Sequence, residues 1–528
     1  MKNLIIQTLL KLKMLSIKLF LWRPLINKTF HPHQIQNDLL KRILAKNKST
    51  TFGQEHGFEQ IHSYEEYRSK VPVCDYEALR SYIDKQESEG VPHLNASQPV
   101  MYVQTSGTTG EPKNIPILQS TINDYRNSQH IVAYAIYENI PGAYDGKILA
   151  ITSPAVEGVM ASGAQCGAMS GIIYRSMPSI MREKYVLPAK IFEIKDYDQK
   201  YYEMTKLALA EKNITMIATA NPSTLIKLDQ VMNHDPEKII DSVSCINKER
   251  ANELTQILRT HNKLTFSKVW PNVKCVTTWT GGNCGVLIPK LKKEMPTTTR
   301  FVELGYLSSE FRGGITFDVI NNLQLPSLHE NFFEFVEKNA WEDKTPTFLT
   351  LTEIQKGEQY YIFVTTKNGL YRYNINDLIE VTGQLNNTPT IQFVQKGKGV
   401  TNLTGEKLYE GQLIQAMTEI INEKQIHIGF FKMLGCAQKR EYTLYTESNE
   451  LDIADVENRL AKLNIEFESK RKSTRLNPLR LVHLNDGTGE AYKRHCLQLG
   501  QRESQFKMSY LQYQNECSFD FKKHTKDN

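Results

Sequence analysis

Short apolar runs alternate with long helix-forming stretches through the middle of this 528-residue chain. The candidate strands are Ile148–Ile151, Ile214–Ala218, Val273–Thr277, Phe301–Glu303 and Tyr360–Thr365. Stretches that can form helices, such as Tyr201–Ala210 and Ala251–Thr260, lie between several of these strands. Strands that alternate with helices indicate at least partly parallel sheets, so the pattern predicts an α/β layer architecture with β-sheets flanked by helices.

The two ends of the chain differ from this middle part. The first hundred residues are predicted to be mostly helical, as the apolar spacing over residues 35–43 indicates. The short basic run Gln395–Gly399 is typical of either a hinge or an ordinary surface turn. Beyond it, helix and strand patterns recur, including a helix that Asp452 caps. We therefore predict a large domain over residues 1–395 and a small α+β domain over residues 396–528.

Composition limits the partners and the compartment. The net charge of +6 is modest for this length, so no nucleic-acid partner is predicted. A weakly basic protein nevertheless suits anionic substrates such as ATP and carboxylic acids. The eight cysteines form no CxxC pair, which favours reduced thiols in the cytoplasm over a metal site or a disulfide framework. The sequence does not specify an oligomeric state, and a monomer is the default expectation.

The first 22 residues are apolar but are interrupted by Lys11, Lys13 and Lys18. The uninterrupted apolar run is too short for a membrane span, and no small-residue cleavage site follows it. We favour an amphipathic helix that packs on the body of the protein. Weak peripheral contact with a membrane is the alternative.

The run Thr105–Lys113 has the composition of a phosphate-binding loop. Glycines allow backbone amides to converge on an anion, hydroxyls add hydrogen-bond donors, and a terminal lysine adds a mobile positive charge. The P-loop pattern of nucleoside triphosphatases does not fit, because Pro112 stands where its second glycine should be. The candidate residues are Thr105, Ser106, Gly107, Thr108, Thr109, Gly110 and Lys113.

Two further loops follow predicted strands. Gly281 and Gly282 come after the strand at Val273, and paired glycines there let a flat ligand such as adenine approach the backbone. In the second loop, Tyr306 can stack on a ring, Ser309 can donate to a phosphate and Glu310 can hold Mg²⁺. The candidate residues of this second loop are Tyr306, Ser309 and Glu310.

Two more motifs complete the set. In Tyr371–Asp377, the Asp377 carboxylate can accept hydrogen bonds from both ribose hydroxyls, and the nearby Arg372 adds positive charge. Gly405–Glu410 includes Lys407 and follows the candidate hinge. Each motif alone is typical of an ordinary turn or strand, but their joint occurrence in this order favours a nucleotide site.

With these motifs in place, the chain resembles the auxin-responsive-promoter family of acyl-acid amido synthetases, a branch of the acyl-adenylate-forming superfamily. The resemblance extends nearly from end to end. Besides the motifs above, it includes Thr51–Gly53, His56–Phe58, Trp279–Asn283 and Gln505–Lys507. It implies a large N-terminal α/β domain and a small mobile C-terminal domain, with the active site between them. One departure is Asn376, which stands where family members usually have glycine. Since asparagine tolerates left-handed backbone geometry, we expect the turn to persist.

The resemblance also implies a reaction. MgATP converts a carboxylic acid to an acyl-adenylate, and the amine of an amino acid then attacks to give an amide and AMP. The loop at residues 105–113, Tyr306, Ser309 and Asp377 would bind ATP, and Glu310 would hold Mg²⁺. A mobile C-terminal lysine would bridge the carboxylate and the phosphate; Lys507 is the first choice and Lys407 the second.

Alternative interpretations stay open. An acyl-CoA ligase would share the first half-reaction and use a thiol in the second. A non-catalytic nucleotide-binding protein could also keep this fold. The acid is not specified by the sequence, although we expect its pocket between about residues 120 and 230, including Tyr174 and Met216.

Overall fold

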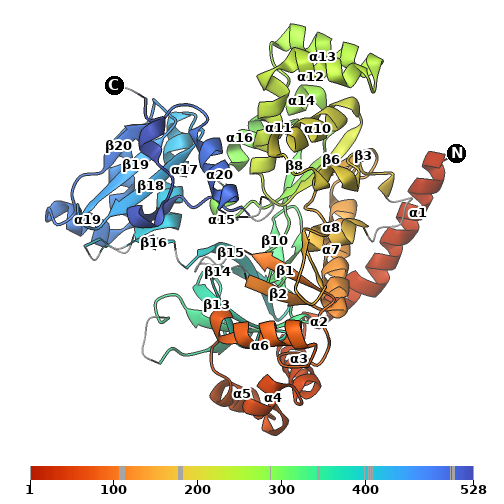
Figure 1. The fold of residues 1–528 in the computed structure, drawn as a ribbon, viewed down its shortest axis with the longest axis vertical. Coiled ribbons are helices and arrows are strands. Elements are labelled where there is room, and N and C mark those ends of the chain that lie inside the picture. The colour runs from red at the N-terminus through yellow and green to blue at the C-terminus, as the bar shows by residue number, and fades with distance from the viewer. Residues whose placement is uncertain are drawn as a thin grey trace. The chain divides into compact units, whose positions relative to one another are not determined.

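The computed structural model describes residues 2–105, 113–175, 182–285, 287–341, 345–397, 399–401, 403–404, 406, 408–499, 501, 503 and 506–526 (Figure 1). The chain divides into two compact units. Unit 1 comprises Met1–Thr280, Leu287–Ile375 and Ile379–Phe393, and unit 2 comprises Gly281–Val286, Asn376–Leu378 and Val394–Asn528. The main segment of unit 2 therefore begins next to the boundary predicted at residue 396.

The first hundred residues form the helices that the sequence predicts. They are α1 (Lys2–Ile17), the π-helical turn η1 (Lys18–Trp22), α2 (Arg23–Lys28), α3 (Pro32–Asn47), α4 (Thr51–Glu55), η2 (Phe58–Gln60), α5 (Tyr64–Lys70) and α6 (Tyr76–Glu89). Local side-chain caps begin several of them: Ser63 accepts a hydrogen bond from the amide of Glu66, and Asp75 accepts one from the amide of Ala78. In the described part of the chain, no helix is long and apolar enough to cross a membrane.

A four-stranded parallel sheet lies at the centre of unit 1. Its order is β3 (Lys147–Ile151), β6 (Ile214–Thr219), β7 (Cys275–Thr278) and β8 (Arg300–Glu303). The side chains of Leu149, Ile217 and Val276 are completely buried, because helices cover both faces of a parallel sheet. The carboxyl ends of the four strands meet at one edge, where ligands bind in open α/β sheets.

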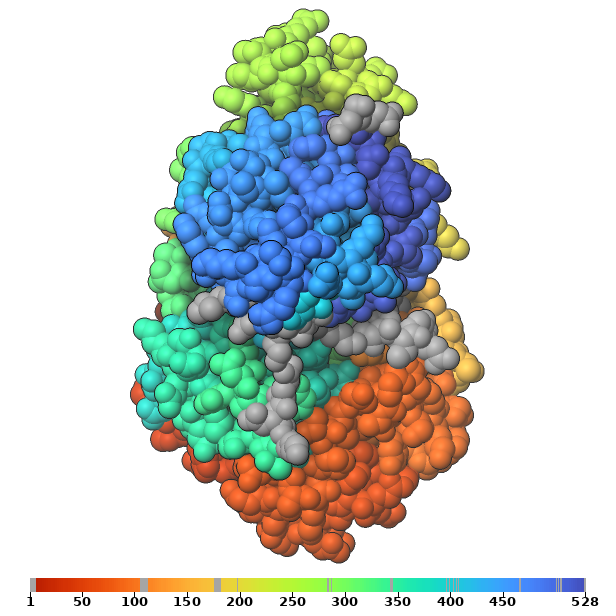
Figure 2. All heavy atoms as spheres, turned by 90° about the vertical axis from the view of Figure 1, so that its left-hand side faces the viewer, coloured from red at the N-terminus to blue at the C-terminus, as the bar shows by residue number. Residues whose placement is uncertain are grey.

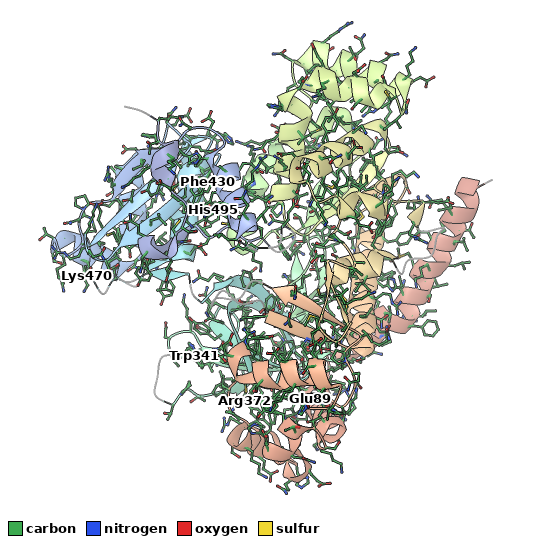
Figure 3. All side chains as sticks on the ribbon, in the orientation of Figure 1. Glu89, Trp341, Arg372, Phe430, Lys470 and His495 are labelled. Atoms are coloured by element: carbon green, nitrogen blue, oxygen red, sulfur yellow. The ribbon has the colours of Figure 1, made fainter. Side chains whose placement is uncertain are left out.

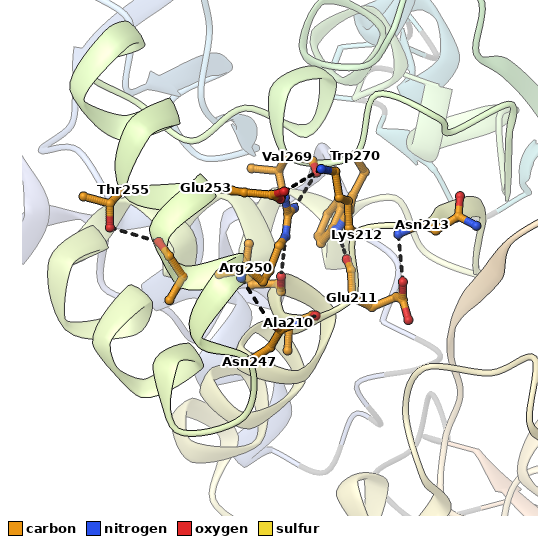
Figure 4. A network of polar contacts seen from close by, with 12 residues as sticks. Ala210, Glu211, Lys212, Asn213, Asn247, Arg250, Glu253, Thr255, Val269 and Trp270 are labelled. Carbon is orange, nitrogen blue, oxygen red and sulfur yellow. Dashed lines mark hydrogen bonds and ion pairs between the residues drawn. The ribbon is translucent and has the colours of Figure 1, made fainter.

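A group of helices alternates with the sheet strands in sequence and packs beside them (Figure 1). It comprises α10 (Tyr197–Ala210), α11 (Ser223–His234), α12 (Pro236–Ser244), α13 (Lys248–His261), α14 (Phe266–Val269) and α16 (Ile288–Glu294), with α8 (Met169–Arg175) and η3 (Ala189–Glu193) preceding it. The buried guanidinium of Arg250 fastens three of these helices together (Figure 4). It donates to the carbonyl oxygens of Leu209 at 3.1 Å and Val269 at 2.6 Å, and to Glu253 at 2.9 Å.

The remaining sheets of unit 1 are mainly antiparallel. One has the order β2 (Lys113–Ile117), β1 (Met101–Thr105), β5 (Gln165–Cys166) and β4 (Gly158–Val159). A second has the order β12 (Leu349–Thr350), β11 (Asn331–Glu337), β13 (Gln359–Thr366), β14 (Tyr373–Leu385) and β15 (Thr388–Lys396). The hairpin of β9 (Gly314–Asp318) and β10 (Leu323–Pro326) packs near α7 (Gln119–Asn139). The strands β13 and β14 are neighbours in the second sheet, and the short segment that joins them includes Gly369.

Unit 2 is an α+β body of its own. Its main sheet has the order β20 (Arg480–His483), β19 (Glu441–Thr446), β18 (Phe431–Cys436) and β21 (Leu511–Tyr513). The helices are α15 (Gly282–Gly285), α17 (Glu410–Lys424), α18 (Ile453–Leu463), α19 (Ile465–Lys472) and α20 (Thr488–Gln498). The short pieces are β16 (Val400–Thr401), β17 (Leu408–Tyr409), η5 (Gln514–Glu516) and η6 (Phe521–His524). Figure 2 shows one face of this unit, in light to dark blue.

Candidate active-site loops

The candidate phosphate loop joins two paired strands. Thr105 is the last residue of β1 and Lys113 the first of β2, and the two residues face each other in the antiparallel register. The Lys113 ammonium lies 5.6 Å from the ring centre of Tyr76. The residues between them, Ser106, Gly107, Thr108, Thr109, Gly110, Glu111 and Pro112, lie outside the described residues. The strand pair therefore defines where this loop leaves and re-enters the sheet.

A buried carboxylate holds the loops that follow β7 and β8. Glu303 ends β8 and is only 6% exposed. Its Oε2 accepts hydrogen bonds from the backbone amide of Thr280 at 2.6 Å and the Thr280 hydroxyl at 2.8 Å. Its Oε1 accepts a third from the amide of Gly305 at 3.1 Å. This role of Glu303 was not predicted from the sequence, where its one signal is an acidic residue at the end of an apolar strand.

The Tyr306 ring is part of an aromatic cluster. It stacks on Phe393 with ring centres 5.6 Å apart, and Phe311 meets it edge-on at 5.5 Å. Gly305 precedes it at a φ of 99°, and a Cβ there would lie 2.5 Å from the carbonyl oxygen of Gly314. Only glycine fits this backbone, so it permits the turn that places Tyr306.

Ser309 and Glu310 lie at the tip of a closed turn. The amide of Ser308 donates to the carbonyl oxygen of Phe311 at 2.9 Å, and the Phe311 amide donates back to the Ser308 hydroxyl at 3.3 Å. Ser309 and Glu310 are half-buried. Next to the turn, the buried Arg312 side chain donates to the carbonyl oxygens of Leu304 at 3.0 Å and Gly314 at 3.2 Å. Both ends of the turn are thus anchored, which fixes the backbone that carries Ser309 and Glu310.

The described residues contain no group of three His, Cys, Asp or Glu side chains that could hold a metal ion. Mg²⁺ keeps several waters and is usually held by one or two carboxylates together with substrate phosphates. A single carboxylate such as Glu310 is therefore a donor of the right chemistry.

Arg372 has a different environment from the one expected. Its Nε lies 3.0 Å from each oxygen of the Glu334 carboxylate, and its Nη1 donates to the carbonyl oxygens of Arg68 and Val71. The guanidinium stacks on Phe348 at 4.5 Å, and the backbone adopts a φ of 41°. Both charged side chains are buried in unit 1 (Figure 3). Glu334 therefore balances the Arg372 charge inside the fold, and the role of Arg372 toward a nucleotide stays a prediction.

Asp377 and the paired glycines belong to unit 2. Asn376 adopts the left-handed conformation with a φ of 56°, so the turn persists without glycine, as expected. Its carbonyl oxygen accepts a hydrogen bond from the amide of Gly397 at 2.7 Å. Asp377 follows and is 1% exposed. Gly282 has a φ of 53° and begins α15, which contacts α17.

The two candidate lysines also belong to unit 2. Lys507 is half-buried and follows the buried Phe506. Lys407 lies outside the described residues, but its neighbour Glu406 is buried. Burial opposes the charge on Glu406, yet hydrogen bonds from Tyr442 at 2.5 Å and from the amides of Leu403 and Thr404 hold its pKa below the ordinary value. Glu406 thus ties this segment to β19.

The two residues expected in the acid pocket are core residues. Tyr174 is 5% exposed, and its hydroxyl donates to the carbonyl oxygen of Leu187 at 2.7 Å. Its ring packs edge-on against Tyr185 and Phe192. Met216 is 7% exposed within β6. Their contacts therefore give them a packing role in unit 1.

Comparison with known families covers most of the chain. The GH3 family N-terminal domain matches residues 23–299, the GH3 family central domain matches 325–396, and the GH3 family C-terminal domain matches 411–516. The chain belongs to the GH3 family. Its loops at Gly305–Phe311 and Asn376–Asp377 fall between or within these matched GH3 domains.

Three GH3 relatives are named for their activities, which differ in the acid. An Arabidopsis thaliana indole-3-acetic acid-amido synthetase, GH3.15, is 27% identical over 74% of this chain and 72% of its own length. A 4-substituted benzoates-glutamate ligase from the same plant, GH3.12, is 22% identical over 75% and 76%. A jasmonoyl-L-amino acid synthetase from Oryza sativa subsp. japonica, GH3.5, is 24% identical over 90% and 91%.

Solved structures show the same fold. GH3.15 acyl acid amido synthetase matches with a TM-score of 0.82 at 21% identity, covering 96% of each chain. A 2-hydroxyisobutyryl-CoA ligase in its postadenylation state matches with a TM-score of 0.57 at 10% identity, covering 91% of this chain and 89% of its own. The predictions of the family, of the acyl-adenylate-forming fold and of an amide-forming ligase are confirmed.

Proposed function

We propose that this GH3 protein activates a carboxylic acid with ATP and Mg²⁺ and transfers the acyl group to the amine of an amino acid. In the first step a carboxylate oxygen attacks the α-phosphate, and the bond to pyrophosphate breaks. In the second the amine attacks the acyl carbon, the carbon–oxygen bond to AMP breaks, and the nitrogen loses a proton. The three relatives described above are named as acid-amido synthetases or acid–amino acid ligases, which supports this reaction.

One observation carries the proposal beyond family membership. The loop Gly305–Phe311 leaves the carboxyl end of the parallel sheet and is held at both ends by buried charged side chains, Glu303 and Arg312. A ligand at this edge would meet the Ser309 hydroxyl and the Glu310 carboxylate in fixed positions. We assign Ser309 to the phosphates and Glu310 to Mg²⁺. The loop that Thr105 and Lys113 enclose would hold the remaining phosphate oxygens.

Unit 2 supplies the other groups of the proposal. We assign Asp377 to the ribose, Gly281 and Gly282 to the adenine, and Lys507 to the bridge between acid and phosphate, with Lys407 as the alternative. A lysine suits the last role because it is a point charge on a flexible stem. We further propose that residues 396–528 act as the mobile domain, that a monomer is the working unit, and that the eight cysteines, which form no CxxC pair, reflect a cytoplasmic location.

The decisive experiment is acid-dependent exchange between ATP and labelled pyrophosphate, with Mg²⁺ and a panel of aromatic, indole-type and fatty carboxylic acids. Exchange with one acid supports adenylation. Amino acids and CoA are then compared as acceptors, and an amide product without a thioester supports the proposed second step. ATP binding without exchange for any acid, or a product formed only with CoA, would contradict it.

Variants separate the two lysines. Lys507→Ala is expected to abolish exchange while ATP still binds, and Lys522→Ala, an exposed lysine of the same unit, is the matched control. If Lys407→Ala abolishes exchange instead, Lys407 holds the role. For the metal, Glu310→Gln is expected to raise the Mg²⁺ concentration needed for half-maximal exchange, whereas Glu237→Gln on the exposed side of α12 should leave it unchanged.

A further inference from the structure

The N-terminal helix has two apolar faces. Leu10, Met14 and Ile17 are buried in a cluster with Tyr134 of α7. The Trp22 ring, just beyond the helix, packs edge-on against the same tyrosine with ring centres 5.3 Å apart. One face of α1 is therefore part of the folded body, and Figure 1 shows the helix at the margin of unit 1.

The other face carries large apolar side chains that the protein leaves exposed. Leu12 is 59% exposed, Leu15 is 51% and Phe20 is 73%. Among the described residues, twelve large apolar side chains are exposed, and five of them belong to this segment: Leu9, Leu12, Leu15, Leu19 and Phe20. Four are separated by three, three and four residues, which places them along one side of the helix. Exposed apolar patches of this kind mark a binding surface.

The charged side chains of this N-terminal segment itself are all basic. The first acidic residue of the chain is Asp38. The basic side chains before it are Lys2, Lys11, Lys13, Lys18, Arg23 and Lys28. Lys11, Lys13 and Arg23 are exposed beside the leucines. Over the whole chain, by contrast, 64 basic residues nearly balance 58 acidic ones. The match to the GH3 N-terminal domain begins at residue 23, after this segment.

We infer that the exposed face of residues 9–20 binds the surface of a lipid bilayer that contains anionic lipids. The leucines and Phe20 would enter the boundary between headgroups and acyl chains, and the lysines would reach the lipid phosphates. The helix would lie in the plane of the membrane, since its opposite face is held by α7. A second protein copy would not select for a segment without acidic residues, whereas an anionic surface does.

Co-sedimentation of the full-length protein with vesicles tests the inference. Vesicles of phosphatidylcholine mixed with phosphatidylserine are expected to pellet the protein, whereas phosphatidylcholine alone pellets much less. A Leu12→Ser/Leu19→Ser variant should bind the mixed vesicles at least about tenfold more weakly, because two apolar side chains are lost. A Lys11→Gln/Lys13→Gln variant should lose about as much and show a weaker dependence on salt.

Controls keep the result specific. Leu499→Ser removes a leucine that is 64% exposed in unit 2 and should leave vesicle binding unchanged. The leucine variant and the lysine variant should both unfold at the wild-type temperature and keep wild-type pyrophosphate exchange without vesicles. These two measurements distinguish a loss of vesicle binding from a loss of fold or activity. Wild-type protein that does not bind the mixed vesicles would overturn the inference. So would unchanged binding by the leucine variant, or light scattering that shows a dimer abolished by the same substitutions.

Discussion

The buried ion pair between Glu334 and Arg372 allows the sharpest test of the fold. The Glu334 carboxylate is fully buried on β11 and accepts bonds from Arg372 and from the Tyr64 hydroxyl at 3.0 Å. Burial raises the pKa of Glu334, and the adjacent guanidinium opposes that rise. Replacing Glu334 by leucine leaves the Arg372 charge buried with two carbonyl oxygens and the Phe348 ring as its remaining partners.

The expected cost follows from that unpaired charge. Removing one member of a buried ion pair typically costs about 3–5 kcal/mol. Replacing both members by apolar residues leaves no charge buried and is often close to neutral. A Glu334→Leu/Arg372→Met variant leaves the Tyr64 hydroxyl and the two carbonyl oxygens without their partners, at about 1 kcal/mol each. That total is about 3 kcal/mol, so we expect the double variant to be at least as stable as Glu334→Leu and up to about 2 kcal/mol more stable.

Urea unfolding measures this difference. The first cooperative transition of unit 1 is followed for wild type, both single variants and the double variant. A single free energy of unfolding is not defined for a chain whose two units can unfold separately. Glu337→Leu, an exposed glutamate on the same strand, is the matched control. The Arg372→Met variant should bind ATP with an affinity near that of wild type at temperatures where the variant is folded. A Glu334→Leu cost below about 1 kcal/mol, or a double variant that loses the sum of both singles, would refute the reasoning.

Three further predictions use other buried carboxylates. Burial raises the pKa of Glu330 from 4.5 to about 7, so the folded protein keeps a proton that the unfolded chain releases, and stability falls as pH rises between these values. Glu330→Gln should remove that fall and exceed wild type by roughly 3 kcal/mol above pH 7 in urea unfolding; an identical pH profile would contradict it. Glu303→Ala should free Thr280 and Gly305 and slow pyrophosphate exchange by about 10²-fold with the fold retained, and unchanged exchange would count against the role of Glu303. The pKa of Glu406 is lowered, so wild type should lose stability as pH falls through that value, and Glu406→Gln should show a flatter acid limb in calorimetry; parallel curves would exclude this linkage.

Local features were predicted well because their causes lie within a few residues. The strands proposed at residues 148, 214, 273, 301 and 360 are all present, and those of β3, β6, β7 and β8 pair in parallel. The cap at Asp452 and the left-handed turn at Asn376 also occur where the residue types predicted them. Residues 470–472 form the last turn of the helix α19 (Lys470 in Figure 3). There, Lys472 pairs with Glu468 one turn earlier at 2.7 Å.

The roles of the charged side chains were harder to predict, because a charge takes its role from partners that folding brings near. Arg372 was predicted to add positive charge near a nucleotide. In the structure its guanidinium pairs with the carboxylate of Glu334, 38 residues earlier in the chain. Glu303 looked like an ordinary strand end, yet it joins Thr280 to Gly305. Tyr174 was predicted to line the acid pocket, but its hydroxyl donates a hydrogen bond to the carbonyl oxygen of Leu187.

The sequence alone predicted the family, the alternation of strands and helices, and the chemistry that each loop offers. These features are local, because periodicity, capping and turn preference act over a few residues. Packing between segments far apart in the chain decides which charged side chains form buried ion pairs. It also decides which apolar face of the first helix stays exposed. Burial makes an unpaired charge expensive, so only the tertiary structure separates the ionic groups that hold the protein together from those left to act on a ligand.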